Sequence, residues 1–141
     1  MKVQWAMLAN AVEVRDGLVN MLGGAWDSIA VTQTPEEGAP LAVMRATLVL
    51  RVLLDRSETG RDHTIELRVV DADGSVQAQT SGTFSAKPNP GLPIGWDQGL
   101  VLPISLSGAR LNRVGGHEVT ILIDGEFHQS VPFQVVDRRG G

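Results

Sequence analysis

The chain has 141 residues, a length that fits one domain with a single core and needs no disulfide or metal ion to stabilise the fold. The formal net charge is -4 and the 12 Lys and Arg residues are scattered, so the basic surface that nucleic-acid binding requires is missing. No apolar run reaches the ~20 residues of a membrane helix, and the lack of cysteine excludes disulfides and thiolate chemistry and fits a reducing compartment. We expect a cytoplasmic protein without a nucleic-acid or membrane partner.

The N-terminal part of the chain alternates apolar and polar residues, which is the pattern of half-buried strands. We expect a first strand with Val3, Trp5 and Met7 facing the core, because the apolar run at the N-terminus is too short for a signal peptide. We expect a turn next, at residues 13–17, and then two strands at residues 18–22 and 25–34. A proline-containing loop should follow at residues 35–40.

The longest apolar run, residues 41–54, predicts a strand at the centre of the core. Its even-numbered residues form one uninterrupted apolar face: Met44, Ala46, Leu48, Leu50, Val52 and Leu54. Arg45, Thr47 and Arg51 interrupt only the other face, and this period of two favours a strand over a helix. Residues 55–62 then form a charged, solvated loop.

Residues 64–84 predict a β-hairpin that is closed by a four-residue loop at residues 71–74. In this register Val69 pairs with Val76, so the apolar residues of both strands, including Phe84, lie on one face. The change from odd to even apolar positions across the loop agrees with that pairing.

A proline-rich loop and an edge strand are expected next. Residues 87–96 should run extended over the surface in polyproline-like geometry. Residues 100–106 form a strand, and Pro103 places it at a sheet edge or at a bulge, because proline cannot donate to a central ladder.

The last regular stretch, residues 117–134, predicts a second hairpin around an Asp124-Gly125 turn. The apolar residues on both sides of the turn are expected to face the core: Val119, Ile121, Ile123, Phe127, Val131, Phe133 and Val135. All of them occupy odd positions, whereas a two-residue turn would pair Ile121 with His128. We therefore predict a loop with an odd number of residues, or a bulge near Pro132.

These elements define an all-β protein of seven or eight strands without an amphipathic helix. The pattern favours a two-sheet antiparallel sandwich of immunoglobulin-like architecture, with a small β-barrel as the alternative. The paired cysteines and the tyrosine corner of immunoglobulin domains are absent, so only the architecture is inferred. Residues 1–136 are expected to form a single domain and residues 137–141 a flexible C-terminal tail.

Five segments spread over nearly the whole chain carry a family resemblance: WAMLANAVEVRDGL (5–18), LGGAWD (22–27), VVDADG (69–74), NPGLP (89–93) and ILIDGEFHQSVPF (121–133). They resemble a family of small bacterial proteins described only as a domain of unknown function. The resemblance implies a stand-alone intracellular β-sandwich, and it implies no catalytic residue, cofactor or partner.

No group of residues predicts an enzyme or a metal site. The three histidines are too far apart in sequence for a metal-ligand motif: His63, His117 and His128. Asp71–Gly74 begins like a calcium loop, but Gly82 stands where the bidentate glutamate is needed, so a turn is predicted. The adjacent carboxylates Glu36 and Glu37 lie in a solvated loop, and no serine elbow or phosphate-binding glycine loop is present. We expect a non-catalytic protein without a cofactor.

Two features remain as binding candidates. Trp96, with Leu92 and Ile94, lies in the proline-rich loop, where an aromatic ring can stack on a sugar or on a peptide proline. The favoured interpretation, however, has Trp5 and Trp26 filling the core and Trp96 holding the loop against the protein. The other feature is the C-terminal sequence Arg139, Gly140 and Gly141, which resembles the tail of ubiquitin-like modifiers, although no helix of their fold is predicted.

We therefore expect a non-catalytic module for protein–protein interaction or self-association, through an exposed strand edge or a cluster of loops. Thr120 and Leu122, on the outer face of the last hairpin, are candidate edge contacts, whereas Pro103 and Pro132 protect strand edges. The alternatives are a carbohydrate- or peptide-binding module that uses Trp96, and a modifier conjugated through Gly141.

Overall fold

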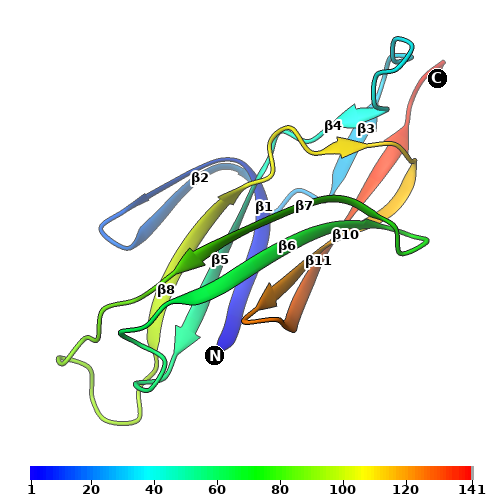
Figure 1. The fold of residues 1–141 in the computed structure, drawn as a ribbon. Coiled ribbons are helices and arrows are strands. Elements are labelled where there is room, and N and C mark those ends of the chain that lie inside the picture. The colour runs from blue at the N-terminus through cyan, green and yellow to red at the C-terminus, as the bar shows by residue number, and fades with distance from the viewer. Residues whose placement is uncertain (141) are drawn as a thin grey trace.

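The computed structural model describes residues 1–140, and every regular element in them is a β-strand (Figure 1). The strands are β1 (Lys2–Arg15), β2 (Leu18–Gly24), β3 (Ser28–Val31), β4 (Ala42–Val43), β5 (Thr47–Leu54), β6 (His63–Asp71), β7 (Val76–Phe84), β8 (Gln98–Ser105), β9 (Arg110–Leu111), β10 (Gly115–Ile123) and β11 (Glu126–Asp137). The prediction of an all-β protein is confirmed. Within the described residues no helix is long and apolar enough to cross a membrane.

The strands form two curled main sheets and one small ribbon. The order in the four-stranded sheet is β2-β1-β5-β8, and the order in the five-stranded sheet is β3-β11-β10-β6-β7. All neighbouring pairs are antiparallel except β3 and β11, which run parallel. The structure has eleven strands instead of seven or eight, partly because the run 41–54 divides into β4 and β5. Between them the backbone of Met44 bonds the loop at Ala109 and Gly108 instead of a neighbouring strand.

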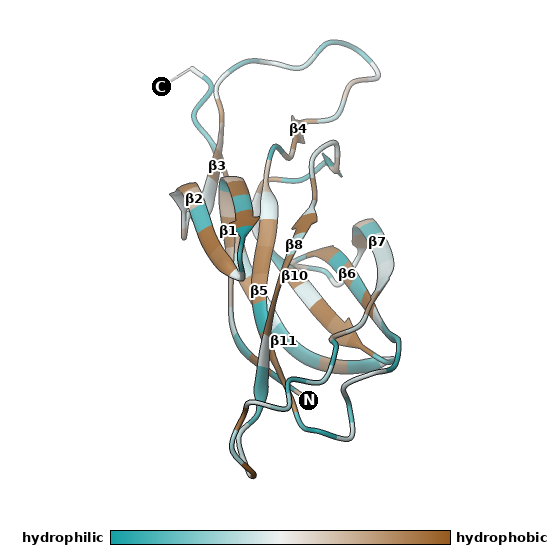
Figure 2. Cartoon of the chain, turned by 90° about the vertical axis from the view of Figure 1, so that its left-hand side faces the viewer, coloured by the Kyte–Doolittle hydropathy of each residue, from teal (hydrophilic) through white to brown (hydrophobic). Residues whose placement is uncertain are grey.

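One hydrophobic core lies between the two main sheets. Side chains that are at most 2% exposed come from β5 (Leu48, Leu50, Val52, Leu54) and from β10 (Val119, Ile121, Ile123). The apolar residues along β5 are visible in Figure 2. The predicted even-numbered face of the run 41–54 is therefore confirmed, including Met44 and Ala46.

A bulge in β1 reverses the predicted orientation of its side chains. Val3 pairs with Val52, but the register shifts before Trp5, which pairs with Arg51. Because a bulge adds one residue to one strand, the inward positions change from odd to even. Ala6 and Leu8 consequently face the core, whereas the prediction that Trp5 and Met7 do so is wrong.

A second bulge decides the register of the β10–β11 hairpin. The turn has two residues, with φ of 51° at Asp124 and 80° at Gly125, and Ile123 pairs with Glu126. The prediction of a loop with an odd number of residues is therefore wrong. The alternative of a bulge holds, but the bulge lies at His128 instead of near Pro132, since Ile121 pairs with Gln129.

The bulge at His128 divides the apolar residues of β11 between the two faces of the sheet. Beyond the bulge Val119 pairs with Val131, and Phe133 is 1% exposed, as predicted. Before the bulge Phe127 pairs with Leu122 and is 63% exposed, so its predicted place in the core is wrong. One extra residue thus moves a phenylalanine from the interior to the surface.

The β6–β7 hairpin contains a similar irregularity. Val69 pairs with Ala78 and Val70 with Val76, so Gln77 is the extra residue, and the predicted pairing of Val69 with Val76 is wrong. Val76 is exposed as a result. The loop is a turn, as predicted, and the buried Asp71 carboxylate accepts hydrogen bonds from backbone amides within it.

Candidate functional site at the proline-rich loop

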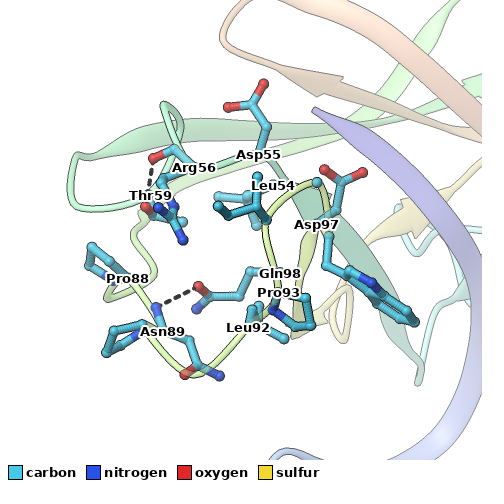
Figure 3. A pocket seen from close by; sticks show the side chains of 14 residues that line it. Leu54, Asp55, Arg56, Thr59, Pro88, Asn89, Leu92, Pro93, Asp97 and Gln98 are labelled. Carbon is cyan, nitrogen blue, oxygen red and sulfur yellow. Dashed lines mark hydrogen bonds between the residues drawn. The ribbon is translucent and has the colours of Figure 1, made fainter.

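The proline-rich loop, residues 87–97, connects β7 to β8 and lies beside the loop that follows β5 (Figure 1). The two loops meet at one end of the molecule because Leu54, the last residue of β5, pairs with Gln98, the first residue of β8. Together they line a pocket of about 640 Å³ (Figure 3). A second hollow of about 610 Å³ lies beside it and includes Arg51 and Gln4. The proline-rich loop is thus a wall between two concave surfaces.

The amide of Gln98 holds the base of the loop. Its Oε1 accepts from the backbone N–H of Asn89 at 3.0 Å (Figure 3). Its Nε2 donates to the carbonyl of Lys87 at 2.7 Å. Two turns follow, in which Leu92 N–H donates to the Asn89 carbonyl and Trp96 N–H donates to the Pro93 carbonyl, each at 3.2 Å. The loop is therefore folded into turns, and the prediction of an extended polyproline-like segment is wrong.

The loop presents apolar side chains to solvent. Trp96 is 69% exposed and Ile94 is 93% exposed, while Leu92 is half-buried. The favoured interpretation that Trp96 holds the loop against the protein is consequently wrong. All three predicted binding residues line the same pocket, so the structure does bring them together.

Charged residues of both signs stand around the pocket. Asp55 and Arg56 come from the loop after β5, and Asp97 comes from the end of the proline-rich loop. The hydroxyl of Ser57 donates to the Asp55 carboxylate and lowers the pKa of Asp55 below its usual value. The Asp55 carboxylate also accepts from the Glu58 amide, and the Glu58 carboxylate accepts from the Asp55 amide, which fixes the turn reciprocally.

His63 joins the loop after β5 to the turn of the β10–β11 hairpin. Its Nδ1 is 2.7 Å from Asp124 Oδ2, and its Nε2 is 2.7 Å from the carbonyl oxygen of Glu58. The ring is buried and stacks on Phe84 at a centroid distance of 5.5 Å. The Glu58 carbonyl and the Asp124 carboxylate raise the pKa of His63. Sequence reasoning missed this clamp, because nothing local connects residues 61 positions apart.

The other tryptophans and histidines occupy separate places. Trp26 packs edge-on against Phe133 at the border of the core, as predicted, whereas Trp5 lies on the opposite face of its sheet. His117 stacks on Phe133, and His128 is the bulge residue of β11. In the part of the chain that the structure describes, no group of three or more His, Asp or Glu side chains could hold a metal ion.

The predicted edge contacts are not at an edge. Thr120 and Leu122 lie on β10, which pairs with β6 on one side and with β11 on the other. They face outward from the middle of the sheet, and Leu122 lies beside the exposed Phe127. Their assignment as edge contacts is therefore wrong. Pro103, by contrast, is on the edge strand β8, as expected.

The residues at the C-terminus bond β3 and one another. Arg138 N–H donates to the Val31 carbonyl at 2.8 Å, and the Arg139 guanidinium pairs with the Asp137 carboxylate at 3.0 Å. This pairing lowers the pKa of Asp137 to about 2. Gly140 has a φ of 73°, and the predicted conjugation site Gly141 lies outside the described residues.

Fold and site together define an all-β protein of two curled sheets that exposes an aromatic loop beside a pocket. A model of a family of unknown function, DUF6941, matches residues 4–136, and the chain belongs to this family. The expected membership of a domain of unknown function is confirmed. No curated protein and no solved structure matches the chain.

Proposed function

We propose that the protein is a non-catalytic interaction module that binds another protein through the proline-rich loop. The observation that carries this proposal is the exposure of Trp96 and Ile94 on a loop whose base is held by Gln98. Tryptophan is enriched among the residues that dominate protein interfaces, and apolar anchors work best when they are rigid before binding. Burying an apolar side chain of this size under a partner stabilises the complex by roughly 1.5–3 kcal/mol.

The surroundings of the two anchors support a protein partner. Trp96 and Ile94 line the pocket together with Asp55, Arg56 and Asp97. Protein–protein interfaces likewise combine apolar anchors with polar side chains. Because both signs of charge are present, the partner should carry polar groups of both signs beside an apolar pocket or groove.

A small ligand is the second candidate, and the pocket itself favours it. Its volume of about 640 Å³ falls within the range of roughly 300–1,000 Å³ of ligand sites. The exposed Trp96 ring could stack on a sugar or on a proline of a peptide. In this alternative the indole is a platform for one ligand, whereas in the first it is an anchor in the surface of a partner.

We also propose an arrangement of the two main sheets and a cellular location for the protein. We infer a two-sheet sandwich of immunoglobulin-like character, which is supported by the single core between the two main sheets. A cytoplasmic location is supported by the lack of cysteine in a chain of 141 residues. Neither inference depends on the identity of the binding partner.

Photo-crosslinking in the native cell tests the main proposal. A benzophenone amino acid at Ile94 should give a discrete adduct with another protein, and Trp96→Ala should abolish it. The matched control carries the same group at Val76, an exposed apolar residue of the β6–β7 hairpin. Equal adducts at both positions, or none at Ile94, would contradict the proposal.

Fluorescence distinguishes the small-ligand alternative. Subtracting the emission of Trp96→Phe from that of the unmodified protein isolates Trp96 from the indoles of Trp5 and Trp26. Titration with oligosaccharides and proline-rich peptides should shift this difference signal if Trp96 is a platform. An unchanged signal across the panel removes the alternative and leaves the protein–protein proposal untouched.

A further inference from the structure

β2 is an unprotected edge strand. Among the described strands its only sheet neighbour is β1, and its sequence LVNMLGG contains no charge and no proline. The other sheet edges are protected or short: β8 carries Pro103, β3 has only four residues, and β7 contains the bulge at Gln77. Proteins normally protect edge strands with charge, proline or short length, so an edge without these devices indicates pairing.

The β1–β2 hairpin also extends beyond the core. β5 pairs with β1 only over Lys2–Ala9, whereas β2 pairs with the continuation of β1 up to Arg15, and the resulting arm is visible in Figure 1. Four apolar residues on one face of the arm lie outside the core cluster: Val12, Val14, Val19 and Met21. A two-stranded ribbon is marginal in water, so further strands would stabilise the arm.

The register of the arm shows which backbone groups of β2 are free. Asp16 and Gly17 form a two-residue turn with φ of 54° and 73°, and Arg15 pairs with Leu18 next to the turn. In such a hairpin the pair beside the turn is hydrogen-bonded and the pairs alternate along the ribbon. The backbone groups of Val19 and Met21 therefore point away from β1, toward the open edge.

We propose that a second copy of this chain adds its own β2 to this edge, antiparallel, about a two-fold axis at Asn20. The backbone groups of Val19 and Met21 then bond those of Met21 and Val19 in the second copy. Leu18 lies opposite Leu22 of the second copy, and the two Asn20 side chains face each other. The two arms become one four-stranded ribbon.

The side chains of β2 argue for a second copy over a foreign chain. Leu18 and Leu22 are 69% and 74% exposed and lie on one face, each two residues from Asn20. Because of this symmetry, a two-fold axis at Asn20 places Leu18 of each copy opposite Leu22 of the other. Both are non-hydrogen-bonded pairs, in which the side chains are closest. A two-fold axis also places the residue at the axis opposite its own copy, and the residue there is the uncharged Asn20.

A charge swap at the axis tests this geometry without disturbing the core. The unmodified protein should show a mass of twice 15.1 kDa at high concentration in light scattering. Asn20→Lys and Asn20→Glu should each be monomeric, because like charges meet at the axis, and an equimolar mixture should dimerise again. The control Thr83→Lys places a charge on the β7 edge and should leave the dimer intact. Circular dichroism spectra establish that every variant is folded.

Disulfide trapping provides a second readout. The chain has no cysteine, so Asn20→Cys introduces a single thiol. Opposed residues in a non-hydrogen-bonded antiparallel pair have Cα atoms about 4.5 Å apart, which is within disulfide range. Mild oxidation should convert Asn20→Cys to a covalent dimer much faster than the control Thr83→Cys. Equal rates for the two variants, or a monomeric unmodified protein at every concentration, would overturn the proposal.

Discussion

The Nδ1 atom of His63 lies 2.7 Å from the Oδ2 atom of Asp124, which joins the start of β6 to the turn between β10 and β11. The other ring nitrogen lies 2.7 Å from the carbonyl oxygen of Glu58. Both neighbours are acceptors, so only the doubly protonated ring donates to both. This requirement agrees with the raised pKa of His63 and the lowered pKa of Asp124, each caused chiefly by these hydrogen bonds.

The first prediction concerns pH. A raised folded-state pKa of His63 stabilises the protein fully below the ordinary value of 6.5, and this stabilisation is lost as pH rises through the folded-state pKa. The lowered pKa of Asp124 gives stability that is lost only at acidic pH, below its ordinary value of 3.8. Urea unfolding should therefore show that His63→Gln lowers the free energy of unfolding more below pH 6.5 than in alkaline solution. The difference should be about 1–2 kcal/mol.

The matched control for this experiment is Gln129→Ala, next to the bulge of β11, which removes no titratable group. It should change the free energy of unfolding by a similar amount at every pH. If His63→Gln shows the same flat dependence as the control, the protonated clamp is absent. A cost that increases with pH would equally contradict it, because the sign of the effect follows from the raised pKa.

The second prediction tests the bulge at His128. Phe133→Ala should cost about 3–5 kcal/mol, because Phe133 is 1% exposed and fills the core. Phe127→Ala should cost no more than about 0.5 kcal/mol, since Phe127 is 63% exposed. Chemical denaturation of the two variants measures the difference directly. Similar costs would indicate that both rings face the core and that the register is continuous through His128.

The third prediction uses two glycines of opposite behaviour. Gly125 has a φ of 80°, so Gly125→Ala strains the turn and should destabilise the protein by about 1 kcal/mol. Gly82 lies within β7 at an ordinary φ, with open space where a Cβ would be. Gly82→Ala should therefore stabilise the protein by up to about 0.5–1 kcal/mol. Thermal melts of the two variants should shift in opposite directions.

The fourth prediction concerns the amide of Gln98. Gln98→Glu keeps an acceptor for the Asn89 amide but faces the Lys87 carbonyl with an oxygen where a donor stood. The proline-rich loop should loosen, which faster proteolysis of the loop and a lower fluorescence anisotropy of Trp96 would report. Gln33→Glu, in an exposed loop, is the matched control. Unchanged anisotropy in Gln98→Glu would mean that the loop is held by its turns alone.

The strands and the central core could be predicted from the sequence because both depend on local alternation. The face of β5 is an example, since no residue interrupts its even positions. The positions of the three single-residue bulges, at Gln4, Gln77 and His128, could not be predicted. Each one reverses the faces on one side of it, which explains the wrong placement of Trp5, Val76 and Phe127.

The candidate site was predictable in its members but not in its geometry. Trp96, Leu92 and Ile94 could be selected because they are apolar residues in a proline-rich loop. The loop that carries them is folded into turns, and its base is held by Gln98. A hydrogen bond from this amide to Lys87, 11 positions away, leaves no local signal in the sequence. The His63–Asp124 clamp spans 61 positions and is equally invisible to alternation or motif.

The division of β1 at Ala9 has a consequence for local unfolding. Up to Ala9 the strand has β5 as a neighbour and contributes Leu8 to the core, whereas beyond it the strand has only β2. Backbone amides of one continuous strand therefore belong to two regions of different stability. In hydrogen exchange the first half of β1 should exchange only with global unfolding, while the arm should exchange through brief openings that leave the core closed. A peptide inserted at the tip of the arm, at Gly17, should consequently leave the core intact.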